Sequence, residues 1–179
     1  MRMLSERRSE APVPIDRLHS PPGVDIGVLA LRLTVGLLLA GHGAQKLFGL
    51  FGGSGISGTG KWFASQGYRP GEFFAGCAGV SEVLGGLGLA VGLLTPLAAA
   101  ALVGVMINAM VTTSVHGLWD VDGGLELPLC VAVVALAVTA IGPGRYALDR
   151  LFPWRCGGLR AAAFALVLGG VGAAIVQAV

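Results

Sequence analysis

The sequence predicts an all-α, polytopic membrane protein, and three properties of the 179-residue chain support this fold class. Hydrophobic residues make up 54% of the chain, charged residues make up 12%, and the mean hydropathy is +0.78. The apolar residues are gathered into long runs, and 30 residues are glycine, which is frequent in transmembrane helices. A soluble domain of this size needs more surface charge. The net charge of +2 is too small to indicate a nucleic acid as a partner.

The transmembrane helices follow from length, because about 20 apolar residues cross a bilayer as an α-helix. Five segments have this character: Asp25–Phe48, Phe73–Leu94, Pro96–Val115, Leu125–Ile141 and Leu159–Ala178. Only Thr95 separates the second segment from the third. We expect Thr95 to cap the third helix, with Pro96 at its first position, where the missing N–H costs nothing. The second and third segments are therefore predicted to form a tight helical hairpin.

The chain divides into three parts. Residues 1–24 are predicted to be a disordered cytoplasmic tail, because the first 22 residues are polar and contain four arginines and four prolines. They also lack the apolar core and cleavage site of a signal peptide. Residues 25–151 are predicted to form a transmembrane bundle. Residues 152–179 are predicted to be a C-terminal loop and a fifth transmembrane helix.

The distribution of basic residues predicts the orientation. With the N-terminus in the cytoplasm, eight arginines lie on the inner side and three lysines or arginines on the outer side. This excess places the glycine-rich loop Gly49–Glu72 outside the cell. Within that loop we expect a short helix, Gly60–Gln66, with Thr59 as its N-cap. The loop also matches a dinucleotide-binding glycine pattern, but no strand precedes it, so a flexible turn is the better interpretation.

Several polar residues interrupt the apolar segments. On insertion scales an isolated charged side chain in the bilayer centre costs about 2.5–3.5 kcal/mol. Such residues persist where they pair, line a hydrated cavity or do chemistry. They are therefore the candidate ligand-pocket and proton-relay residues: Arg32, His42, Lys46, Glu82, Asn108 and Glu126.

The depth of these residues predicts that they converge in one layer. Counted from the outer ends of the segments at 1.5 Å per residue, three of them lie about 9–14 Å deep, namely His42, Glu82 and Asn108. Lys46 and Glu126 lie within about 5 Å of the outer edge. We expect His42 to pair with Glu82 and Lys46 with Glu126, since attraction strengthens in a low dielectric. Arg32 lies deeper, toward the cytoplasmic half.

Each of these residues also has a structural interpretation. Lys46 could extend to the headgroups, and His42 could donate a hydrogen bond between helices. Glu82 suits a structural ion pair as well as a ligand-binding role. Cys77 and Cys130 are expected to be buried packing thiols. The sequence contains no signature of a haem, flavin, iron–sulfur cluster or metal site.

Five motifs follow one another between about Leu29 and Leu151: LRLTVGLLLAGHGAQKLFG, FGGSGISGTGKWFASQG, GVSEVLGGLGLAVGLLTPLAA, GGLELPL and GPGRYALDRL. In these motifs the chain resembles the DoxX family of small bacterial membrane proteins. The family core is a four-helix bundle, so the fifth helix and the N-terminal tail are extensions here. The resemblance implies a bacterial cytoplasmic (inner) membrane protein.

The family is named for subunits of an archaeal thiosulfate:quinone oxidoreductase, and mycobacterial members are linked to thiol stress. The resemblance therefore implies a quinone- or thiol-linked redox subunit, with a bound quinone and a soluble or membrane redox partner, in a chain that could form homo-oligomers. In that role His42 and Lys46 would bind or protonate an anionic oxygen. Glu82 would pair with them and relay protons, while Arg32 and Glu126 would fix the geometry.

Two other hypotheses belong to different classes. The chain could be a non-enzymatic scaffold that holds soluble detoxifying enzymes at the bilayer. It could also be a small-solute transporter, although it lacks the clear internal repeat of many transporters.

Overall fold

The computed structural model describes residues 22–152 and 157–178. These residues form six α-helices and four short 3₁₀ turns, and no strand occurs among them. The helices are α1 (Pro22–Phe48), α2 (Gly55–Ser65), α3 (Gly71–Val91), α4 (Thr95–Thr113), α5 (Glu126–Ile141) and α6 (Leu159–Ala178). Of the predicted tail, residues 1–24, the first 21 residues lie outside the described part of the chain. The last three residues of the tail are the first residues of α1.

The predicted fold class is confirmed. In the described part of the chain, four helices are long and apolar enough to cross a membrane: α1, α3, α6, and α4 with the 3₁₀ turn that extends it to His116. Helix α5 has the same apolar character but only 16 residues, or about 24 Å of rise. All five predicted segments coincide with these helices to within about one helical turn.

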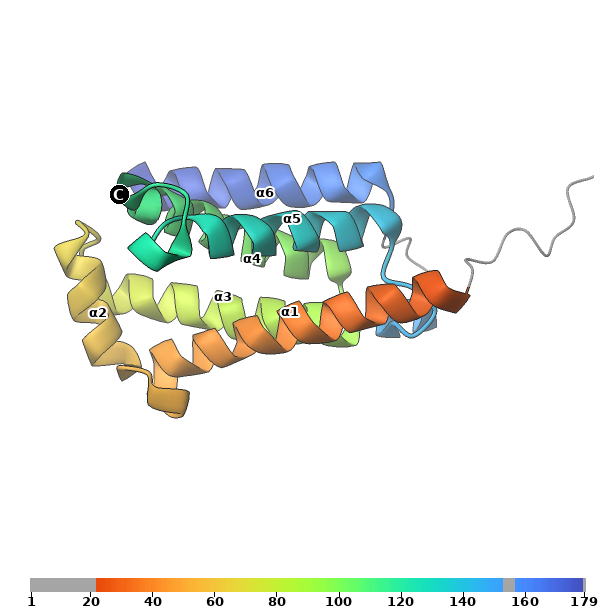
Figure 1. The fold of residues 1–179 in the computed structure, drawn as a ribbon, viewed down its shortest axis with the longest axis horizontal. Coiled ribbons are helices and arrows are strands. Elements are labelled where there is room, and N and C mark those ends of the chain that lie inside the picture. Colours follow the sequence, from red (N-terminus) through yellow and green to blue (C-terminus); the bar gives the residue numbers. More distant parts are fainter. Residues whose placement is uncertain (1–21, 153–156, 179) are drawn as a thin grey trace, which may run out of the picture.

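The helices pack in two layers (Figure 1). Helices α1 and α3 lie side by side in one layer, and α4, α5 and α6 form the other, with α4 in contact with α3, α5 and α6. Helix α2 lies across one end of the bundle, which we call the α2 end. The opposite end holds the α3–α4 turn and residues 142–151, and we call it the turn end.

Glycine contacts bring α1 and α3 together. A Cβ atom placed on Gly36 would lie 2.5 Å from the Gly86 carbonyl oxygen, and one on Gly43 would lie 2.6 Å from the Gly79 oxygen. Both helices therefore need glycine where their backbones meet, as in many membrane bundles. This close approach sets the polar side chains of α1 directly against α3.

The prediction for the short loop helix was wrong at its start. Helix α2 begins at Gly55, after Ser54, and Thr59 lies inside it. Tertiary packing explains the difference, because a Cβ atom on Gly60 would lie 2.6 Å from the Glu72 side chain. The glycines that look like a flexible turn in the sequence instead let α2 approach α3 closely.

Candidate functional site

The polar residues fall into two groups at opposite ends of the bundle. At the turn end Arg32 is only 1% exposed. Its guanidinium donates to the carbonyl oxygens of Leu89 (3.0 Å), Ala90 (2.9 Å) and Pro143 (2.6 Å). Two of these carbonyls belong to the last turn of α3, where backbone acceptors lack helical partners and a cation is favourable. Arg32 therefore caps the C-terminus of α3.

Asp149 performs the corresponding role for α4. Its carboxylate accepts hydrogen bonds from the backbone N–H of Leu94 (2.7 Å) and Thr95 (3.0 Å), and from the Thr95 hydroxyl (2.7 Å). The predicted capping role of Thr95 is therefore wrong. A carboxylate is the stronger acceptor at a helix N-terminus, and Thr95 donates to it instead. Asp25 accepts from the backbone N–H of Arg145 (3.0 Å). We call Arg32, Asp149 and Asp25 the turn-end cluster.

At the α2 end Lys46 and Glu82 form an ion pair. The Lys46 Nζ lies 2.9 Å and 2.7 Å from the two Glu82 carboxylate oxygens. The Glu82 side chain is 3% exposed, whereas that of Lys46 is 26% exposed. The predicted partner of Glu82 was His42, and the predicted partner of Lys46 was Glu126. Lys46 pairs with Glu82 instead of Glu126, because side chains on a helix lean toward its N-terminus and the long lysine reaches past His42. The predicted attraction between His42 and Glu82 is present as an electrostatic interaction beside this ion pair.

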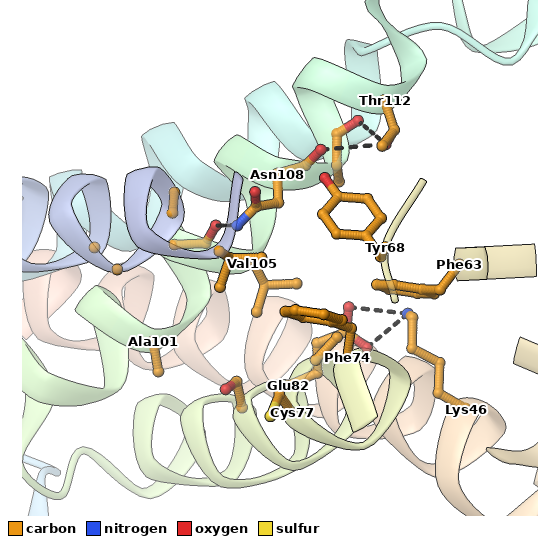
Figure 2. Close-up of a pocket in the computed structure, with 18 of the residues that line it drawn as sticks. Lys46, Phe63, Tyr68, Phe74, Cys77, Glu82, Ala101, Val105, Asn108 and Thr112 are labelled. Carbon is orange, nitrogen blue, oxygen red and sulfur yellow. Dashed lines mark hydrogen bonds and ion pairs between the residues drawn. The ribbon is translucent and has the colours of Figure 1, made fainter. Parts of the chain in front are cut away.

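This ion pair borders a cavity of about 550 Å³ (Figure 2). Helices α3, α4 and α6 line it, together with Lys46 of α1, helix α2 and the loop that follows α2. The volume lies within the range of small-molecule sites. The polar lining consists of Lys46, Glu82, Ser81, Asn108, Thr112, Thr113 and Tyr68. Most of the remaining lining is apolar, a combination that is typical of ligand pockets.

Aromatic side chains form one wall of the cavity. The ring of Tyr68 lies 5.5 Å from that of Phe63 and 5.6 Å from that of Phe74, and Trp62 packs edge-on against Phe63 at 5.3 Å. These spacings suit favourable aromatic pairs. Burial raises the pKa of the Tyr68 phenol, so this group is a neutral hydrogen-bond donor at physiological pH. The rings are tilted relative to one another, and they join α2 to α3 along one side of the cavity.

Asn108 occupies the α4 side of the cavity (Figure 2). Its amide nitrogen donates to the Gly104 carbonyl at 3.2 Å, and its amide oxygen accepts from Gln177 of α6 at 3.1 Å. An amide group has two N–H donors, so one donor is left for a ligand. The Thr112 hydroxyl instead donates to the carbonyls of Asn108 and Ala109 in its own helix.

Three of the six predicted site residues therefore line one cavity: Lys46, Glu82 and Asn108. The other three are not among its described lining residues. Arg32 lies in the turn-end cluster, and Glu126 is the first residue of α5. His42 is half-buried and interacts electrostatically with Glu82.

Sequence reasoning missed the contribution of Tyr68, Phe74 and helix α6. The aromatic residues Trp62, Phe63 and Tyr68 within the loop Gly49–Glu72, followed by Phe73 and Phe74, were the available signal. The prediction of buried thiols was also wrong. Cys77 and Cys130 are exposed on the surface of the described chain, and Cys77 lines the cavity.

Comparison with known proteins agrees with this architecture. The model of the DoxX family matches residues 27–116, which include Lys46, Glu82 and Asn108. An uncharacterised membrane protein of Mycobacterium tuberculosis is 32% identical over 146 residues, covering 74% of this chain and 84% of the relative. No solved structure matches the chain. The chain therefore belongs to the DoxX family, and it is a multi-pass integral membrane protein.

Proposed function

We propose that this protein is a redox-associated membrane subunit that binds a quinone in the cavity at the α2 end. The observation that carries the proposal is that Lys46 lines a cavity and at the same time forms an ion pair with the buried Glu82. An ammonium group has three N–H donors, and the two carboxylate oxygens of Glu82 take two of them. The third can donate to an oxygen atom of a ligand.

The cavity walls suit a flat ring with polar oxygens. Phe63, Tyr68 and Phe74 offer faces and edges for aromatic contact, and aromatic pairs of this kind contribute about 0.5–1.5 kcal/mol each. Asn108 and Lys46 line the same cavity, so each can donate to one quinone oxygen. A ring placed between them uses the polar groups of the cavity without leaving a charge unpaired.

The chemistry that follows is proton exchange beside the ring. Reduction of a quinone to a quinol takes up two electrons and two protons. The Lys46–Glu82 pair can pass protons to the quinone oxygens, and a soluble or membrane redox partner supplies the electrons. A dithiol of the partner that is oxidised to a disulfide provides both electrons and both protons, which accounts for a thiol-linked activity without a redox group in this chain.

Trp62 gives a direct test, because it lines the cavity. Substitution of Trp119 and Trp154 by Phe leaves Trp62 as the only tryptophan. In lipid nanodiscs, a short-chain quinone should quench Trp62 fluorescence saturably. Lys46→Met should remove the saturation while the circular dichroism spectrum stays unchanged.

The matched control carries Trp119 alone, after substitution of Trp62 and Trp154. Trp119 is 62% exposed and is not among the described lining residues, so it should report only partitioning of quinone into the lipid. Non-saturating quenching that is equal in both proteins would reject the quinone site. The scaffold hypothesis would then be preferred, because it requires no ligand in the cavity.

A further inference from the structure

Helix α6 lies beyond the segment that the family model matches, yet it forms one wall of the cavity. A Cβ atom on Gly169 would lie 2.7 Å from the Ala100 oxygen of α4, so glycine is needed for the two helices to meet. The hydrogen bond between Gln177 and Asn108 fixes the far end of α6 against α4. The cavity is therefore complete only when α6 is in place.

The cavity is elongated along α4. Its lining on this helix runs from Leu97 to Thr113, a distance of about 24 Å at 1.5 Å per residue. The polar residues Asn108, Thr112 and Thr113 occupy the α2 end of this stretch. The other end is apolar, and its lining residues are Leu97, Ala100, Ala101 and, from α6, Leu168.

The apolar end reaches the molecular surface. Leu97 and Leu168 both line the cavity and are 46% and 42% exposed. In a multi-pass membrane protein this surface contacts lipid chains, so an apolar chain can enter there without crossing water. The cavity thus has a polar compartment beside Lys46 and an apolar exit into the bilayer.

We infer that the site takes an amphipathic ligand. The hydrogen-bonding headgroup of this ligand lies at Lys46 and Asn108, and its apolar chain lies along α4 in a part of the cavity that we call the chain path. Gly172 of α6 sets the width of this chain path. The identity of the headgroup as a quinone rests on the proposed function, whereas the chain path does not.

Gly172 makes the path testable. It lines the cavity, and a Cβ atom built on it meets nothing within 4 Å, so a larger side chain would occupy open space. A Cβ atom on Gly170 of the same helix would also meet nothing within 4 Å, but Gly170 is not among the described lining residues. Gly172→Leu and Gly170→Leu are therefore a matched pair, with the same change in helix propensity.

The experiment uses the Trp62-only protein in nanodiscs and two quinones with the same ring, one without a chain and one with two prenyl units. With concentrations expressed per lipid, the chain-bearing quinone should bind at least about tenfold more tightly, or about 1.4 kcal/mol. Gly172→Leu should remove this advantage and Gly172→Ala should reduce it. Gly170→Leu should leave it unchanged. Circular dichroism and thermal unfolding of each variant verify that it is folded.

A nitroxide-labelled single-chain lipid separates the two proposals. If both quinones bind equally well in every variant, the chain path is wrong and the quinone site stands. If neither quinone quenches saturably but the labelled lipid does so in a Gly172-dependent manner, the chain path stands and the quinone function is wrong. Non-saturating quenching by all three probes would overturn both.

Discussion

The two ends of the bundle both hold buried charges, but the charged groups at one end bond to the backbone, whereas those at the other end bond to each other. At the turn end, the Nε, Nη1 and Nη2 donors of Arg32 all reach backbone carbonyls, and Asp149 accepts from the backbone of the α3–α4 turn. At the α2 end, Lys46 and Glu82 contact each other and face a cavity. The first arrangement satisfies helix ends, whereas the second leaves a charged donor available. The destination of its hydrogen bonds thus distinguishes a transmembrane charge that satisfies helix ends from one that is still available to a ligand.

The largest effect on stability is expected at the turn end. Arg32→Met removes three donors from backbone carbonyls and takes away a cation that interacts with Asp149, which should lower the free energy of unfolding by about 3–5 kcal/mol. Arg150→Met is the matched control, since Arg150 is exposed in the same segment. Denaturation in detergent measures the free energy of unfolding of both variants. Equal, small losses would mean that the turn-end cluster does not hold the fold.

A smaller loss is expected at the α2 end. Glu82→Ala leaves Lys46 without its partner, but Lys46 is 26% exposed and can move toward the membrane surface. We expect a loss of about 1–3 kcal/mol. Glu72→Ala should cost less, because Glu72 lies at the rim of the bundle and accepts from the Ser57 hydroxyl in an exposed hydrogen bond. If the two substitutions lower the melting temperature equally, Glu82 is not buried as described.

Removal of both charges should separate stability from binding. In Lys46→Met with Glu82→Leu neither member of the ion pair is left without its partner, so the free energy of unfolding should change by less than about 1 kcal/mol. Saturable quenching of Trp62 by quinone should nevertheless be lost. The same fluorescence titration in nanodiscs, run beside the denaturation experiment, tests this. Retention of saturable binding in the double variant would show that the ion pair is not part of the site.

The orientation of the two ends can be tested without any change in stability. Ser54 is exposed at the start of α2, and Arg150 is exposed at the turn end. In a protein without native cysteines, Ser54→Cys should react with a membrane-impermeant maleimide in intact cells. Arg150→Cys should react only after lysis. The reverse pattern would place the α2 end, with Lys46 and Glu82, on the cytoplasmic side and the N-terminus outside.

The helices could be predicted from the sequence because apolar length alone determines them. All five predicted transmembrane segments agree with α1, α3, α4, α5 and α6 to within about one turn. The start of α2 could not be predicted, since Gly55 and Gly58 favour a turn locally, whereas the close contact of Gly60 with Glu72 of α3 arises only in the folded protein. Tertiary contacts outweighed local propensity there.

The site was predicted only in part, for a similar reason. Depth along the helices placed Lys46, Glu82 and Asn108 in one layer, and these residues do line one cavity. Depth does not reveal which way a side chain leans or which residue far along the chain reaches it. The capping of Thr95 by Asp149, which is 54 residues away, and the wall formed by α6 could therefore not be derived from the sequence.

The most direct test of the difference between the two ends is the change in melting temperature on addition of a short-chain quinone in nanodiscs. A ligand that binds only the folded protein stabilises it by about 2.7 kcal/mol at a concentration of 100 times its Kd. We predict a saturable increase in the wild type and in Arg32→Met, although the latter melts at a lower temperature, and no increase in Lys46→Met. An increase in Lys46→Met equal to that of the wild type, or its loss in a folded Arg32→Met, would contradict the assignment of binding to the α2 end and of stability to the turn end.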